Sequence, residues 1–111
     1  MEIDVTKDQN YVVMALNGRM DATTTAEFDA AAQKNLDEGQ TRILIDLKDL
    51  VYMSSAGLRS LLNLAKKTKA LQGKIAFCNL QPMVAEVFRI SGFDRILSVE
   101  ADRTQALKIL A

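Results

Sequence analysis

Two strand-like segments open this chain, and helical and strand-like segments alternate after them. Residues 3–7 and 11–17 are joined by the polar turn 7–10, which predicts an antiparallel pair of strands. The remaining sequence predicts strands at 42–47, 74–78 and 96–99, and helices between Asp21 and Gly39, between Ser55 and Gly73, between Pro82 and Gly92, and after Asp102. This order predicts an α/β fold with a mixed sheet of four to five strands and about four helices.

A chain of 111 residues and 12.3 kDa is long enough for one hydrophobic core, because folding at this size buries roughly two thirds of the chain's surface. Four phenylalanines, two tyrosines and no tryptophan make that core mainly aliphatic. We find no linker, repeat or low-complexity segment. We therefore expect one domain over residues 1–111, and a monomer because no exposed apolar stripe is evident.

Fourteen basic side chains balance fourteen acidic ones, so the sequence has no electrostatic footprint for nucleic acid or anionic lipid. The chain has no histidine, and its one cysteine, Cys78, excludes an intrachain disulfide and a thiolate metal cluster. The apolar context of Cys78 predicts a buried structural thiol. Residues 1–4 begin acidic, unlike a signal peptide, and no apolar run is long enough for a membrane span. We expect a cytoplasmic protein without nucleic-acid, membrane, metal or cofactor binding.

Local patterns predict how the first two helices begin and end. Asp21, or one of the threonines at 23–25, is the expected cap of the first helix, and Gly39 its stop. A loop through 51–53 is expected before the second helix, with Met53 either filling the core beneath the loop or exposed to a partner. The apolar stripe of that helix consists of Leu58, Leu61, Leu62, Ala65 and Leu71, and Arg59, Lys66, Lys67 and Lys69 face elsewhere.

The sequence offers little support for an enzyme. It has neither a phosphate-binding loop ending in Gly-Lys-Ser/Thr nor a dinucleotide-binding fingerprint. Asp21 and Asp46 form the one carboxylate pair considered for magnesium binding or acid–base chemistry, which would make the protein a metal-assisted hydrolase. We favour the simpler interpretation, in which these aspartates form a helix cap and a strand-end turn.

The most informative segment is 46–59, which combines a strand end, two adjacent serines and a helix start. Its simplest interpretation is structural: Ser54 or Ser55 caps the first amides of the helix, and Gly57 permits close packing or an unusual turn.

The strings Ile45-Asp46-Leu47 and Tyr52-Met53-Ser54-Ser55-Ala56-Gly57-Leu58-Arg59 resemble the signature of STAS domains, specifically bacterial anti-sigma factor antagonists. The similarity covers essentially the whole chain, including the Gly18–Asp21 turn and the segment from Asn79 to Asp94. The resemblance implies a protein without catalysis whose serine is phosphorylated by a GHKL-type serine kinase, which also acts as an anti-sigma or switch factor. A PP2C-type phosphatase would reverse the modification. The unphosphorylated form would sequester the kinase and free the kinase's other client.

Carried over residue by residue, the resemblance favours Ser55 as the phosphorylated residue, with Ser54 as second choice. The family often has Asp-Ser-Ser/Thr-Gly-Leu where this chain has Ser54-Ser55-Ala56-Gly57-Leu58, so Ser54 replaces the aspartate and Ala56 the second hydroxyl. In some members the modified residue directly precedes the glycine, and here that residue is Ala56, which cannot be phosphorylated. Asp21 matches an acidic residue associated in the family with phosphorylation and partner contact.

We expect the partner-binding patch to centre on the start of the second helix, and its members are Ser54, Ser55, Gly57, Leu58 and Arg59, with Met20 and Asp21 at the rim. Arg59 would contact a partner carboxylate, contact the phosphate, or simply be solvated. A phosphate in this patch would block docking by charge with little refolding. The alternative is a constitutive STAS scaffold or accessory binding module that is not controlled by phosphorylation.

Overall fold

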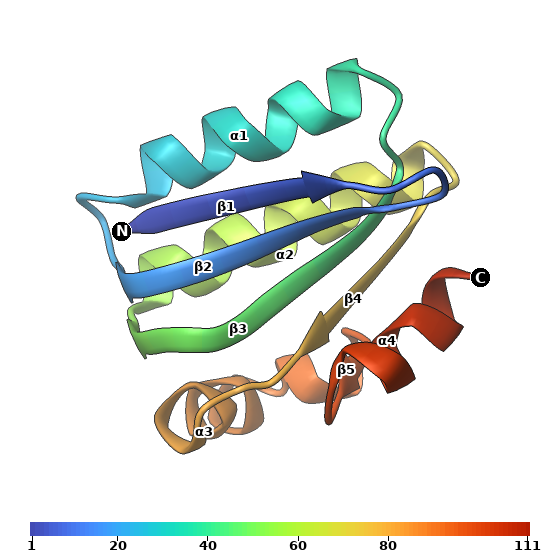
Figure 1. Ribbon diagram of the computed structural model, residues 1–111. Helices are drawn as coiled ribbons and strands as arrows, with labels where there is room; N and C mark the ends of the chain where they lie inside the picture. The colour runs from blue at the N-terminus through green and yellow to red at the C-terminus, as the bar shows by residue number, and fades with distance from the viewer.

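The sheet of this protein has five strands, as a computed structural model of all 111 residues shows (Figure 1). Their spatial order is the same as their order along the chain: β1 (Glu2–Lys7), β2 (Val12–Met20), β3 (Arg42–Met53), β4 (Lys74–Cys78) and β5 (Val99–Glu100). β1 and β2 are antiparallel, and every other neighbouring pair is parallel. The predicted α/β fold with a mixed sheet is confirmed.

Helices cover both faces of the sheet, unequally. The helices are α1 (Thr25–Asp37), α2 (Ser55–Ala70), α3 (Pro82–Ser91) and α4 (Arg103–Leu110), with a 3₁₀ turn at Phe93–Arg95. The larger core cluster joins the sheet to α1, α2 and α3, whereas α4 packs on the opposite face (Figure 1). Residues 43–47 of β3 are all buried, as expected for a central parallel strand covered on both sides. None of the four helices combines the length and the apolarity that crossing a membrane requires.

Four predicted element boundaries were wrong. The second strand, expected at 11–17, runs through Met20, so most of the expected turn at 18–21 belongs to β2. Residues 51–53, expected to form a loop, continue β3, because β2 extends alongside and pairs Met20 with Met53. The last strand begins at Val99 rather than at Ile96, which follows the 3₁₀ turn. Leu71, expected on the buried stripe of α2, lies just beyond the helix and is 54% exposed.

The predicted helix ends were more accurate. Gly39 and Gly92 both have positive φ, at 82° and 78°, a conformation that glycine adopts without strain after a helix. Pro82 is the first residue of α3, where its missing N–H costs no hydrogen bond. Asp102 caps α4, and its Oδ1 accepts a hydrogen bond of 2.9 Å from the amide of Gln105.

The parallel strands bring the start of α2 to one edge of the sheet. β2 ends at Met20 and leads to α1, and β3 ends at Met53 and leads to α2. The amide of Ser54 donates to the carbonyl of Met20 at 2.9 Å, which continues the ladder by one residue beyond β3. The turn after β2 and the first turn of α2 therefore lie at the same edge, on the left of Figure 1.

Candidate functional site

The two adjacent serines differ in what their hydroxyls do. Ser54 is the N-cap of α2, and its Oγ accepts a hydrogen bond of 3.3 Å from the amide of Gly57. Its carbonyl accepts the first bond of the helix, from the amide of Leu58 at 3.0 Å. Ser55 is the first residue of α2, is exposed, and its hydroxyl makes no hydrogen bond within the protein. The predicted cap is confirmed for Ser54, and Ser55 is left with a free hydroxyl.

Three residues expected in the partner-binding patch lie beneath the surface. Met20 has no exposed area, Leu58 is 5% exposed, and Gly57 is buried. A Cβ on Gly57 would lie 2.9 Å from both the Cγ and the carbonyl oxygen of Met20, so the glycine allows α2 to approach the end of β2. Placing these residues on the contact surface was wrong, because they pack the helix onto the sheet. Met53, at 2% exposure, belongs to the same core.

Asp21 does not cap α1, contrary to one prediction. Its Oδ1 accepts hydrogen bonds from the amide and the hydroxyl of Thr23, at 2.9 and 2.6 Å. These bonds, the hydroxyl bond first, lower the pKa of Asp21. The N-cap position belongs to Thr24, whose hydroxyl donates to the Arg19 carbonyl at 3.1 Å and makes no capping bond to the helix. Asp21 therefore holds the turn after β2 and leaves a charged carboxylate at this edge.

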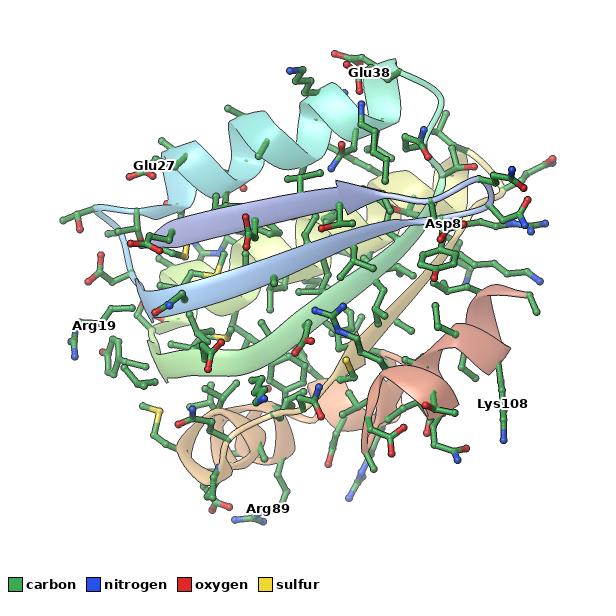
Figure 2. All side chains as sticks on the ribbon, in the orientation of Figure 1. Asp8, Arg19, Glu27, Glu38, Arg89 and Lys108 are labelled. Atoms are coloured by element: carbon green, nitrogen blue, oxygen red, sulfur yellow. The ribbon has the colours of Figure 1, made fainter.

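Two arginines add positive charge to the same edge. Arg59 is exposed, makes no ion pair, and follows Ser55 by four residues, so both lie on one face of α2. Arg19 lies over the ring of Tyr52, 4.1 Å from its centroid, and points outward from the end of the sheet (Figure 2). The cation–π contact was not foreseen from the sequence, because only the pairing of β2 with β3 places Arg19 opposite Tyr52.

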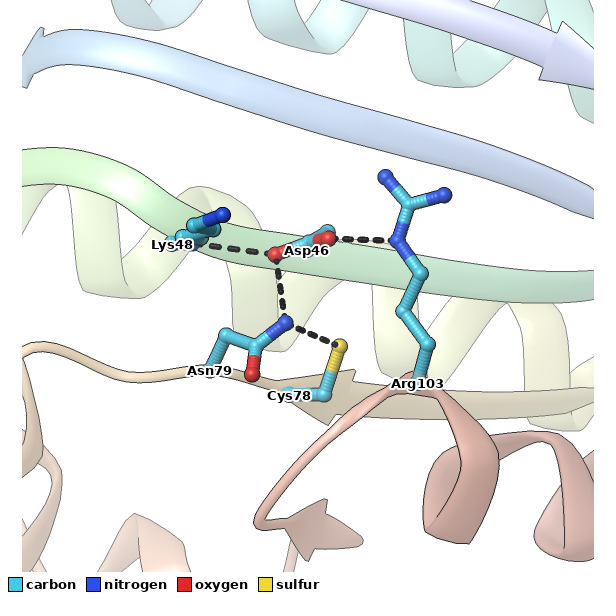
Figure 3. Close-up of polar contacts among 5 residues, drawn as sticks. All are labelled: Asp46, Lys48, Cys78, Asn79 and Arg103. Carbon is cyan, nitrogen blue, oxygen red and sulfur yellow. Dashed lines mark hydrogen bonds and ion pairs between the residues drawn. The ribbon is translucent and has the colours of Figure 1, made fainter.

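Asp46 belongs to a separate polar cluster on the face covered by α4 (Figure 3). Its carboxylate accepts hydrogen bonds from the Lys48 amide, the Asn79 side chain and Arg103 Nε, the last at 2.6 Å. Burial raises the pKa of Asp46, but these three bonds, led by that from Arg103, outweigh it and hold the pKa below its usual value. Nothing in the local sequence signals this ion pair, since its members are 57 positions apart.

The two aspartates considered for a hydrolase do not converge. Asp46 pairs in the sheet with Ala15, whereas Asp21 follows Met20, which pairs with Met53. Asp46 lies seven residues before Met53 along β3, so at about 3.3 Å per residue the two aspartates are roughly 20 Å apart along the strand direction. No group of three acidic or cysteine side chains is placed to hold a metal ion. The suggested carboxylate pair was wrong, because Asp21 is held by Thr23 in the turn after β2 and Asp46 by Arg103 on the other face of the sheet.

Cys78 is fully buried in β4, as predicted. Burial raises the pKa of its thiol to about 12, and the nearby Asp46 carboxylate adds to the effect. The thiol is therefore structural.

The model of the STAS domain family matches residues 2–106 of this chain. The chain belongs to the STAS domain family. A curated relative is BtrV of Bordetella bronchiseptica, named as an anti-sigma factor antagonist; it is 36% identical over 106 residues, which cover 96% of this chain and 91% of the relative. The resemblance noted in the sequence is confirmed at the level of the family.

Solved structures share the architecture of this STAS domain. A crystal structure from Thermotoga maritima, also named as an anti-sigma factor antagonist, superposes with a TM-score of 0.92 at 18% identity and covers 97% of this chain and 93% of its own. SpoIIAA of Bacillus in its phosphorylated form has a TM-score of 0.75 at 22% identity, with 96% and 97% covered. At these identities the two structures show the shared fold.

Proposed function

We propose that this STAS domain is an anti-sigma factor antagonist whose docking to a serine kinase is controlled by phosphorylation of Ser55. The observation that carries the proposal is the contrast at the start of α2: Ser54 Oγ is used by the helix cap, whereas the hydroxyl of Ser55 is exposed and free. A kinase can reach and modify Ser55 without breaking a hydrogen bond of the domain. The name of the relative BtrV supports the role as an antagonist, and the phosphorylated form of SpoIIAA supports control by phosphorylation.

The fold tolerates a phosphate on Ser55. The amides of Ser55 and Ala56 stand in the first turn of α2 and have no acceptor within the helix. Together with the helix dipole, they favour an anion there by about 0.3 to 2 kcal/mol. Arg59, one turn further along, is an unpaired cation on the same face. Phosphorylation therefore leaves the scaffold unchanged.

The same phosphate opposes docking. It adds roughly 1.5 to 2 negative charges to a surface that a partner must cover. Burying such a charge against a surface that offers no matching cation costs several kcal/mol, and about 3 kcal/mol weakens binding roughly a hundredfold. The domain then works as a binding protein without a reaction of its own, switched by one covalent charge.

The docking surface consists of four exposed or half-buried residues at the edge where β2 and β3 end: Asp21, Ser54, Ser55 and Arg59. Met20, Gly57 and Leu58 support this surface from below, since all three are buried. A partner that approaches here meets a carboxylate, two serines and an arginine. Exchange of one neutral hydroxyl for a phosphate turns a surface with balanced charges into one with an excess of roughly 1.5 to 2 negative charges.

The proposed partners are a GHKL-type serine kinase that acts as an anti-sigma or switch factor, and a PP2C-type phosphatase that resets the domain. The unphosphorylated domain sequesters the kinase, and the phosphorylated domain releases it. In this scheme the free domain is a monomer and acts in the cytoplasm, where ATP supplies the phosphoryl group.

The experiment starts by capturing the kinase with the unphosphorylated domain and incubating the complex with ATP and magnesium. Intact-mass measurement is expected to show one added phosphoryl group on the wild type and on Ser54→Ala, and none on Ser55→Ala. Ser91→Ala changes another exposed serine, at the end of α3, and serves as the control that is expected to be labelled. Labelling of Ser55→Ala would refute the assignment of the site.

Binding by a charge variant tests the switch separately. Ser55→Asp is expected to bind the captured kinase at least tenfold more weakly than the wild type, whereas Ser91→Asp is expected to bind equally. Equal binding by Ser55→Asp and the wild type would instead favour a constitutive STAS scaffold or accessory module.

A further inference from the structure

An apolar groove lies at the opposite end of α2 from Ser55. It has a volume of about 420 Å³ and opens between the C-terminal half of α2, the start of β4, the segment before β5, and α4. Its apolar lining consists of Leu62, Ala65, Ile75, Ile96, Leu97 and Ile109. Ile96 is 66% exposed and Ile109 is 37% exposed, so two large aliphatic side chains face solvent at one place. Exposed apolar side chains that gather in a concave site are typical of binding surfaces.

The groove exists because β5 is too short to cover the edge of β4. β5 pairs only with Phe77 and Cys78, so the first part of β4 has no neighbouring strand on that side. The amide of Phe77 donates to the Ser98 carbonyl across this edge. The amide of Ile75, two residues earlier, points to the same side of β4 as that of Phe77, and no residue of β5 pairs with it. An open strand edge therefore forms part of the groove wall.

All charged residues that line the groove are lysines. They are Lys66 and Lys69 of α2 and Lys74 of β4, and no carboxylate lines the groove. Lys74 Nζ donates to the carbonyl of Ala111 at 2.6 Å. Lys66 and Lys69 form no ion pair with any residue of the chain. In a protein of zero net charge, this clustering makes the rim complementary to an anion.

We propose that this groove binds a free fatty acid, a straight-chain carboxylate of about ten carbons, with its chain on the apolar lining and its carboxylate at Lys66 and Lys69. The size of the groove selects this ligand over a protein partner. A volume of about 420 Å³ is usual for a site that holds one small molecule, and the groove is lined by 11 residues, whereas a stable protein interface engages about 20 to 30 residues on each side. The mixture of aliphatic lining and cationic rim matches an apolar chain that ends in one negative charge.

The test is a titration of decanoate into the full chain, followed by backbone amide NMR and calorimetry. We expect saturable binding with shifts at Leu62, Ile75, Ile96 and Ile109. Octanoate is expected to bind about tenfold more weakly, since two methylenes fewer are buried. Decyltrimethylammonium, which has the same chain with a cationic head, is expected to bind at least tenfold more weakly than decanoate.

Substitutions of groove residues test whether decanoate binds in the groove. Ile96→Ser is expected to weaken decanoate binding about fivefold, and the matched control Ile90→Ser, which changes an isoleucine on α3 that is 72% exposed, is expected to leave it unchanged. The Lys66→Glu/Lys69→Glu double variant is expected to lose about tenfold, and Lys48→Glu nothing.

Three results would each overturn the proposal: no saturable binding of decanoate, equal binding of the cationic analogue, or equal loss in Ile90→Ser and Ile96→Ser. Vesicles containing anionic phospholipid, and a synthetic acidic amphipathic peptide, form separate arms of the test. If decanoate does not bind, and binding of either one is weakened by Ile96→Ser and by Lys66→Glu/Lys69→Glu, the groove would be assigned to a membrane surface or to a protein partner instead. Displacement by decanoate would support the proposal.

Discussion

Substitution of the two adjacent serines separates the structural role of Ser54 from the proposed regulatory role of Ser55. Removal of the Ser54 hydroxyl by Ser54→Ala leaves the Gly57 amide without its acceptor. A lost N-cap typically costs about 0.5 to 2 kcal/mol. The bond here measures 3.3 Å, longer than a typical N–H···O bond, so we expect the lower part of this range, about 0.5 to 1 kcal/mol.

Ser55→Ala is expected to change the free energy of unfolding by less than about 0.5 kcal/mol, because the exposed Ser55 hydroxyl has no hydrogen bond to lose. Ser55→Asp is expected to stabilise the domain by about 0.3 to 1 kcal/mol, since a negative charge in the first turn of α2 interacts favourably with the helix dipole.

Urea unfolding and thermal melting measure these differences. For a domain of this length, 1 kcal/mol corresponds to about 4 °C in Tm. The matched control is Asp102→Ala, which removes the cap of α4 with its shorter bond of 2.9 Å and is expected to cost about 1 kcal/mol. A loss for Ser55→Ala as large as that for Ser54→Ala, or a clear destabilisation by Ser55→Asp, would show that the Ser55 hydroxyl is structural and would refute the reasoning behind the switch.

Three further predictions concern the scaffold. Gly57→Ala is expected to destabilise the domain by about 1 to 2 kcal/mol in urea unfolding, because the clash of the new methyl group with the Met20 backbone outweighs the higher helix propensity of alanine. An unchanged or raised stability would contradict the close approach of α2 to β2. Asp46→Asn is expected to destabilise the domain at pH 7, and the difference in unfolding free energy from the wild type should shrink below pH ~4. Folding lowers the pKa of Asp46, so its carboxylate stabilises the domain above the unfolded pKa, and this stability is lost as the pH falls through the folded pKa. A pH-independent difference would exclude the Arg103 ion pair as its source. Cys78 should react with a thiol reagent only at the rate of unfolding, since burial raises its pKa to about 12; fast reaction in the native state would contradict the burial.

Local sequence patterns predicted most elements because their causes are local. Gly39 and Gly92 end helices through their own backbone freedom, Pro82 opens α3 through its fixed φ, and Asp102 caps the helix that it precedes. Errors arose where an element depends on a distant neighbour. β3 runs through Met53 because β2 pairs beside it, and β5 is short because only Val99 and Glu100 pair with β4.

Some features of the candidate site could likewise be predicted from local sequence, and others depended on tertiary contacts. The serines, the glycine and the helix start were evident in the segment 46–59, since an N-terminal helix signal involves neighbouring residues. Their exposure was not, because burial depends on which face of α2 meets the sheet. From the sequence alone, Leu58 and Met20 were therefore predicted in the contact surface, although both are buried.

The order of apolar runs, glycines and caps along this chain determined an α/β domain with two serines at the opening of its second helix. Only the tertiary structure decided which hydroxyl is used and which is free, that Asp46 pairs with Arg103 rather than with Asp21, and that a lysine-rimmed groove opens beside β4. The physical reason is range: backbone propensity and capping act over a few residues, whereas burial, ion pairing and grooves result from contacts between segments that lie far apart in the chain.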